Sequence, residues 1–170
     1  MLVAAAVSVP YDLAAGARHM ETGVTRGYVW RLLRSLQRKV RAKAEVLSRR
    51  IDAPRALAAK TFHEFDDAAT APLHGFRDAD DYYARSSSAR FLTHVAVPTR
   101  LIHALDDPFL PASALPLGEM RRNAALDAVV STTGGHVGFV TGTPWAPRCW
   151  AEERAAEFVA AHLRPVRTAL

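Results

Sequence analysis

The chain has 170 residues, of which 49% are hydrophobic and 23% charged, so it can bury a core of its own. Its single cysteine, Cys149, excludes an internal disulfide and a zinc site built from several thiolates, so a cytoplasmic location is the default expectation. The net charge of +5 is uneven, because residues 26–50 hold nine Lys or Arg and one Glu. That segment carries +8 and leaves −3 for the remainder, so the basic character belongs to one segment.

The chain opens on the apolar stretch MLVAAAVSVP. This stretch has no Lys or Arg before its hydrophobic run and is too short to span a bilayer, which argues against a signal peptide or a membrane helix. It predicts a buried strand over residues 2–9 that Pro10 ends. Such an opening is unusual, because a buried parallel strand needs neighbours on both sides.

Residues 11–90 are expected to be mainly helical. Between residues 28 and 48, apolar positions recur every three or four residues, which predicts an amphipathic helix with a cationic outer face. Residues 51–70 indicate one or two short helices, the first capped by Asp52, and residues 78–92 indicate another helix. Residues 11–23 are expected to form a mixed connection.

The pattern changes after Pro98. Residues 99–105 (TRLIHAL) and 125–133 (ALDAVVSTT) are β-branched and aliphatic runs that are typical of buried parallel strands. Residues 150–163 have apolar positions at helical spacing and predict a closing amphipathic helix. Strands that alternate with helices predict an α/β fold.

Polar side chains follow both predicted strands. Asp106 and Asp107 come after the first strand, and His136 follows the second in a glycine-rich loop. Because parallel strands end at the same edge of a sheet, a carboxylate can reach the imidazole there, fix its tautomer and stabilise its protonated form. A lone histidine in such a loop is more often incidental, and a metal site is disfavoured because His136 has no second ligand at helical spacing. The combination of two strand ends favours an acid and base pair.

Three segments carry a resemblance to a known family: EFDDAATAPLHGFRDADDYYARSS, PTRLIHALDDPFLP and TTGGHVGF. They resemble the C-terminal half of the α/β-hydrolase subgroup that includes bacterial YheT-like hydrolases and eukaryotic ABHD1/ABHD3-type phospholipases and esterases. The similarity runs from Val3 to about Leu163. It implies a partial α/β-hydrolase fold in a single domain: a core strand in residues 1–10, a helical cap in 11–90, and C-terminal strands and helices with acid and base in 91–170.

The resemblance also assigns roles to two residues. The aspartate before Pro-x-x-Pro, here Asp107, is the triad acid of that family, and the histidine of Gly-Gly-His-Val-Gly-Phe, here His136, is the base. Asp107 is preferred to Asp106. The implied activity is serine-dependent hydrolysis of carboxylic esters of small molecules or lipids, and neither a metal nor a cofactor is expected.

The family's nucleophile is the feature that this sequence lacks. Hydrolases of this fold carry the serine in a G-x-S-x-G turn, and none of the eight serines here stands in that motif. By the resemblance, the serine and the oxyanion loop precede the strand at residues 2–9. The chain is therefore expected to be a fragment and nearly inert alone.

The alternative is a non-catalytic interaction module. In that interpretation the chain pairs through its first strand with a separate N-terminal half or with itself, or its basic helix docks on anionic surfaces such as a membrane. For the basic helix, a solvated outer face is the preferred interpretation. Nucleic-acid binding is disfavoured, since the segment has little aromatic interleaving and no known motif.

Overall fold

The computed structural model describes residues 2–163 of the chain. Met1 and residues 164–170, which end the predicted first and last parts of the domain, lie outside the described residues. The contacts divide the chain into two compact units. We call the described residues of Met1–Tyr11 and Ser88–Leu170 the sheet unit, and Asp12–Ser87 the helical unit.

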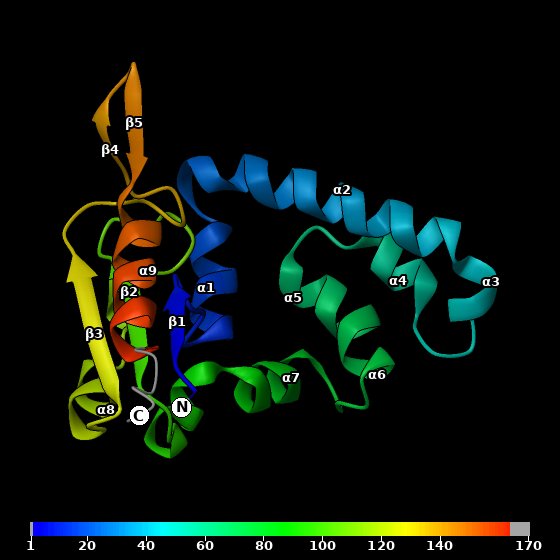
Figure 1. Ribbon diagram of the computed structural model, residues 1–170. Coiled ribbons are helices and arrows are strands. Elements are labelled where there is room, and N and C mark those ends of the chain that lie inside the picture. Colours follow the sequence, from blue (N-terminus) through cyan, green and yellow to red (C-terminus); the bar gives the residue numbers. More distant parts are fainter. Residues whose placement is uncertain (1, 164–170) are drawn as a thin grey trace, which may run out of the picture. The chain divides into compact units, whose positions relative to one another are not determined.

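The sheet unit is built on three parallel strands (Figure 1). Strand β2 (Thr99–Ala104) lies in the centre, with β1 (Ala4–Val7) on one side and β3 (Leu126–Ser131) on the other. Ala4 pairs with Thr99 and Thr99 with Leu126, so the three strands start level and end at one edge. Both strand pairs join segments far apart in sequence or linked by a crossover, as parallel pairing requires.

Helices cover both faces of this sheet. On one face, Ile102 and Ala104 pack with Ala151 of α9 (Trp150–His162). On the other face, Leu101 packs with Met120 of α8 (Leu117–Arg122). A 3-10 segment at Ser88–His94 joins that second layer, and another turn of this type lies at Ala112–Ala114. The alternation of Leu101 and Ile102 between two cores explains why β2 lacks a polar face. The predicted partial α/β fold is confirmed.

Two elements were not predicted. An antiparallel hairpin, β4 (Val140–Thr143) and β5 (Ala146–Cys149), precedes α9 and projects from the sheet unit (Figure 1). Its strands are exposed along their whole length, so no hydrophobic alternation announces them. Helix α1 (Leu13–Met20) replaces the mixed connection expected over residues 11–23, and Asp12 caps it by accepting the Ala15 N–H at 2.9 Å.

The helical unit contains the segments predicted as helices, with shifted bounds. The amphipathic segment forms α2 and then breaks at Lys43, whose φ of −117° and ψ of 20° are not helical. Asp52 caps the following helix as expected, by accepting the Arg55 N–H at 3.1 Å. The elements are α1, a 3-10 turn at Gly23–Thr25, α2 (Arg26–Ala42), α3 (Ala44–Leu47), α4 (Ala53–Ala58), α5 (Phe62–Phe65), a π-helical turn at Asp66–Thr70, α6 (Ala71–Leu73) and α7 (Ala79–Ser86).

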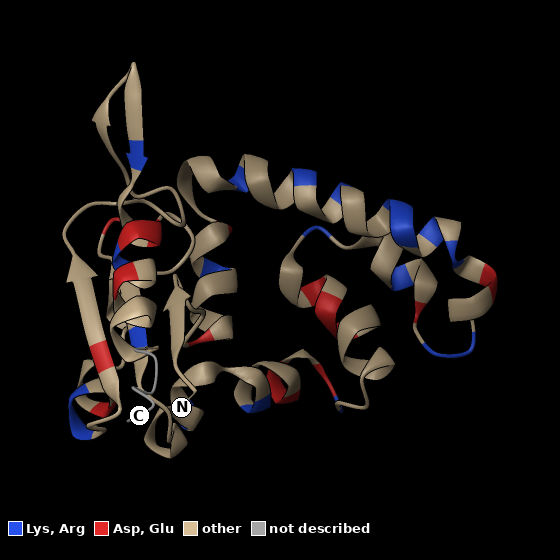
Figure 2. Ribbon diagram, viewed as in Figure 1, with Lys and Arg blue, Asp and Glu red and all other residues tan. Residues whose placement is uncertain are grey.

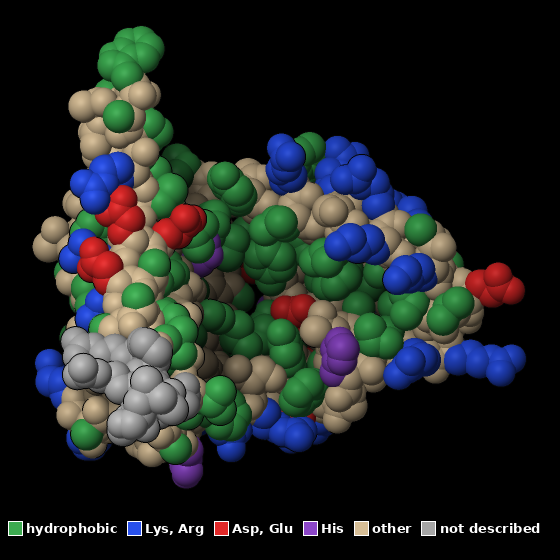
Figure 3. Space-filling view, viewed as in Figure 1, with side chains coloured by type: hydrophobic (Ala, Val, Ile, Leu, Met, Phe, Trp, Pro, Cys, Tyr) green, Lys and Arg blue, Asp and Glu red, His purple; other side chains and the backbone are tan. Residues whose placement is uncertain are grey.

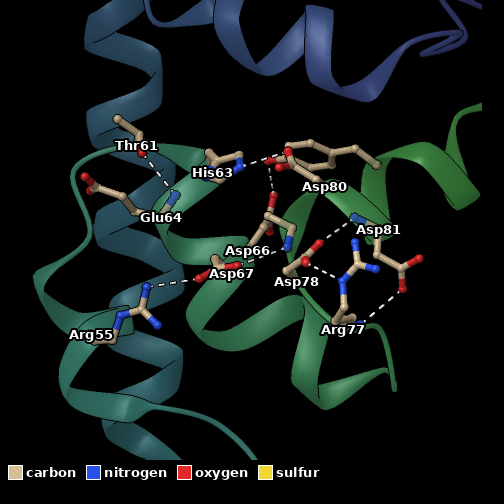
Figure 4. A network of polar contacts seen from close by, with 12 residues as sticks. Arg55, Thr61, His63, Glu64, Asp66, Asp67, Arg77, Asp78, Asp80 and Asp81 are labelled. Carbon is tan, nitrogen blue, oxygen red and sulfur yellow. Dashed lines mark hydrogen bonds and ion pairs between the residues drawn. The ribbon is translucent and has the colours of Figure 1, made fainter.

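This unit has a core of its own. Val29, Leu33 and Val40 from one face of α2 pack against the short helices that follow, including Phe65. The unit's carboxylates are held in caps and in a polar network that joins α4, α5 and α7 (Figure 4). Asp66, for example, accepts the Tyr83 hydroxyl at 2.7 Å. Within residues 2–163, none of the helices is long and apolar enough to cross a membrane. The predicted role of residues 11–90 as a cap stays a prediction.

Candidate active site

Asp107 lies just beyond β2, in the turn at the carboxyl edge of the sheet. Its side chain is fully buried. Oδ1 accepts the backbone N–H groups of Phe109 at 2.8 Å and Leu110 at 3.2 Å, and Oδ2 contacts the Nδ1 atom of His136 at 2.9 Å. Hydrogen bonds to backbone donors favour the ionised form of a carboxylate and hold it in one orientation. The turn therefore presents one fixed carboxylate oxygen to the histidine.

His136 lies in the loop after β3 and turns its Nδ1 atom to Asp107. Its side chain is 31% exposed, and its ring centroid lies 4.8 Å from that of Phe109. The 2.9 Å contact falls within the distance expected of an acid and base pair. In the described part of the chain Nε2 makes no hydrogen bond, so this nitrogen is available to a reacting group. The catalytic roles of both residues remain predictions.

The loop that carries His136 has a backbone that its glycines make possible. Gly135 has a φ of +66°, and a Cβ atom on Gly134 would lie 2.4 Å from the Phe139 ring. Phe139 is buried, has a φ of 40° and stacks on Trp150 with ring centroids 5.9 Å apart. The glycine pair thus lets the loop fold over a buried aromatic anchor and hold His136 at the sheet edge.

Two further residues position this loop. Asp106 accepts the Gly135 N–H at 2.9 Å, so it anchors the backbone next to His136 while Asp107 contacts the ring. Ser8, directly after β1, donates its hydroxyl to the His136 carbonyl. Ser8 is buried and has a φ of 53°, which is uncommon outside glycine and occurs often at functional sites. The signal for Ser8 was its position at the end of a third parallel strand.

His103, on β2, is a buried titratable group beneath the pair. It is 1% exposed, and neither ring nitrogen has a hydrogen-bond partner among residues 2–163. Burial lowers the pKa of His103 from its usual 6.5; the charge of Asp107 opposes this shift and that of His136 adds to it. The Tyr11 ring packs 6.0 Å from His103, and burial raises the pKa of its hydroxyl. Sequence reasoning missed His103 because it reads as one more residue of a buried strand.

These observations define a class of protein. A parallel sheet covered by helices on both faces carries an acid after one strand and a histidine after the next, which is the arrangement of the α/β hydrolases. Nowhere in residues 2–163 do three or more His, Cys, Asp or Glu side chains gather in a way that could hold a metal ion.

Comparison with known proteins identifies the family. The chain is 37% identical to YheT of Escherichia coli over 161 residues, which is 92% of this chain and 46% of that protein. It is 31% identical over 155 residues to the mouse protein named Phospholipase ABHD3, covering 91% of this chain and 38% of the relative. The baker's yeast protein named Monoacylglycerol lipase is 28% identical over 163 residues, covering 92% and 36%.

The chain belongs to the α/β-hydrolase superfamily and is similar to its YheT and ABHD members. It spans about half the length of YheT and less of the other two relatives. No family model matches the chain, and no solved structure matches it significantly.

Proposed function

We propose that this chain supplies the acid and the base of a serine-dependent ester hydrolase, with Asp107 as the acid and His136 as the base. The observation that carries the proposal is the 2.9 Å contact between Asp107 Oδ2 and His136 Nδ1 at the carboxyl edge of the sheet. This contact puts the proton of a neutral imidazole on Nδ1 and leaves the lone pair on Nε2. Nε2 is then the atom that accepts a proton from a nucleophile.

The proposed chemistry is acyl transfer through an acyl-enzyme. His136 takes the proton of a serine hydroxyl as the hydroxyl attacks the ester carbonyl, and then gives that proton to the leaving alcohol. In the second half of the reaction it activates water in the same way. The buried carboxylate of Asp107 stabilises the imidazolium form of His136 in both halves.

The serine is proposed to come from a segment outside these 170 residues. No G-x-S-x-G occurs in the sequence, and Ser8, the serine hydrogen-bonded to the histidine residue, contacts its backbone carbonyl and not its Nε2. The names of the relatives, which include a phospholipase and a monoacylglycerol lipase, support a carboxylic ester as the substrate, either a small molecule or a lipid. No cofactor is needed for this chemistry.

A reconstitution tests the proposal. The chain is joined to the serine-bearing part of YheT that it does not match, and hydrolysis of p-nitrophenyl butyrate is measured. His136→Ala and Asp107→Asn should each lower kcat by about 10³–10⁴-fold, the scale of such losses in serine hydrolases. Asp106→Asn is the matched control, because it removes only an anchor of the loop, and its loss should be far smaller. Equal losses for Asp106→Asn and Asp107→Asn would contradict the assigned roles.

A non-catalytic module is the second candidate function. The observation that favours it is the position of β1, which pairs only with β2 in the described sheet and so leaves one edge for another strand. In this alternative the partner is a separate N-terminal half or a second copy of the chain. An active, Asp107-dependent reconstituted enzyme would reject this alternative as the main function.

A further inference from the structure

A groove in the helical unit lies along α2 and opposite the connection between α4 and α5. Its volume is about 670 Å³. Its lining is divided by chemistry: Val29, Leu33 and Leu57 give it an apolar wall, and Arg26, Arg34 and Lys60 give it three cations. Such a groove has the volume of a small-molecule site and two kinds of surface to match in a ligand.

The cations of this groove are not neutralised by the protein. Helix α2 holds six Lys or Arg residues and no Asp or Glu, and among residues 2–163 none of these six forms an ion pair (Figure 2). The carboxylates of the unit have other partners, as in the network of Figure 4. Glu21, the one carboxylate in the lining, accepts the Phe62 N–H at 3.2 Å.

The groove also holds an exposed aromatic side chain. Trp30 is 61% exposed, although a tryptophan side chain gains much free energy when it is buried. The Arg34 guanidinium lies 4.7 Å from the centre of the Trp30 ring, so a charge and an apolar surface stand side by side. The space-filling view shows blue and green side chains next to one another over α2 (Figure 3). An amphiphile could cover the ring and pair with the guanidinium together.

We propose that this groove binds the monomer of a single-chain lipid with an anionic headgroup, with the acyl chain along Val29, Trp30 and Leu33 and the headgroup at Arg34 and Lys60. The apolar wall accounts for the chain, and the unpaired cations account for the charge. As a statement about the substrate, the inference rests on the proposed function. As a statement about binding, it is independent of hydrolysis.

The emission of Trp30 tests binding directly. In the full chain, Trp145→Phe and Trp150→Phe leave Trp30 as the only tryptophan. The probe is 1-oleoyl lysophosphatidic acid, and the matched neutral lipid is 1-oleoylglycerol, both below their critical micelle concentrations. The anionic lipid should shift Trp30 emission to the blue and saturate, with an apparent Kd at least about tenfold below that of the neutral lipid.

Variants separate a charge effect from a fold effect. Arg34→Ala should weaken binding of the anionic lipid by about tenfold and leave the neutral lipid nearly unchanged, while Arg34→Lys should restore part of the loss. Arg38→Ala is the control on the same helix outside the groove and should change binding less than about twofold. Circular dichroism verifies that each variant is folded.

Three results would overturn the inference. They are equal affinity for the two lipids, the same loss for Arg34→Ala and Arg38→Ala, and a response only to vesicles of phosphatidylserine and phosphatidylcholine, which would make the α2 face a membrane contact. His136→Ala should bind the lipid as well as the parent chain does. Lipid binding without His136-dependent hydrolysis in the reconstituted enzyme would therefore contradict the proposed function and leave this inference standing.

Discussion

The two units use their charged side chains in opposite ways. In the sheet unit, Asp106, Asp107 and His136 are held by each other and by backbone groups at one sheet edge. In the helical unit, the carboxylates are used in caps and in the network of Figure 4, while the cations of α2 have no ion pair among the described residues. The chemistry of the sheet unit is thus inferred from the contacts made, and that of α2 from charges that remain for a ligand.

The energetics of the two arrangements also differ. The Asp107 carboxylate is fully buried, so each hydrogen bond that it accepts matters and its removal leaves donors unsatisfied. The cations of α2 are mostly exposed, and exposed charges contribute little to folding. Substitutions in the sheet edge should therefore affect both folding and activity, whereas substitutions on α2 should affect ligand binding alone.

The largest effect that we predict concerns turnover by the chain alone. Since its sequence holds no G-x-S-x-G, the purified chain should hydrolyse p-nitrophenyl acetate no faster than its His136→Ala variant does. A steady-state assay with both proteins measures this. If turnover depends on His136 and also disappears in Ser8→Ala, then Ser8 is a nucleophile and the proposed origin of the serine is wrong.

The second prediction concerns association through β1. One edge of this strand has no partner in the described sheet, and its N–H and C=O groups are free to pair with another chain. The isolated chain should be oligomeric, aggregated or only marginally folded, and joining it to the unmatched part of YheT should give a monomer. Sedimentation velocity and thermal unfolding of both proteins decide this. A monodisperse, cooperatively melting monomer of 170 residues would contradict it.

A smaller effect is expected from Gly134→Ala. A Cβ atom at this position would lie 2.4 Å from the Phe139 ring, which is buried and unable to move freely. The free energy of unfolding should fall by about 1–3 kcal/mol, as measured by chemical denaturation. Gly27→Ala is the matched control in the helical unit, where nothing lies within 4 Å, and it should change stability by less than about 1 kcal/mol. Equal effects would show that the loop is not tightly packed.

The smallest effect is a change in the acid sensitivity of folding. Burial lowers the pKa of His103 below 6.5 in the folded chain, so between that lower pKa and 6.5 the unfolded chain binds more protons. The stability that a neutral His103 contributes is complete above about pH 6.5 and is lost as the pH falls toward the folded-state pKa. His103→Leu should remove a slope of at most about 1.4 kcal/mol per pH unit in this window. Urea unfolding from pH 5 to 7.5 measures the slope, and identical slopes would mean that His103 is not held neutral.

The sequence predicted the sheet and the pair at its edge because both depend on local patterns. Apolar runs that end in DDP and GGH indicate parallel strands whose ends meet, so Asp107 and His136 could be named together. The hairpin was missed because its strands bury nothing, and α1 was missed because its bounds depend on a cap at Asp12. Contacts across the sheet, such as that of Ser8 with the His136 carbonyl, arise from tertiary packing and have no signal in the local sequence.

The tautomer of His136 is the most direct test of the central claim that Asp107 orients this imidazole as a base. Nitrogen NMR of the histidine ring, measured in the folded protein at a pH where the ring is neutral, should show the proton on Nδ1 and none on Nε2. In Asp107→Asn the amide can donate to Nδ1, so the proton should move to Nε2. A His136 ring that carries its proton on Nε2 in the parent protein, or a tautomer that Asp107→Asn leaves unchanged, would contradict the account.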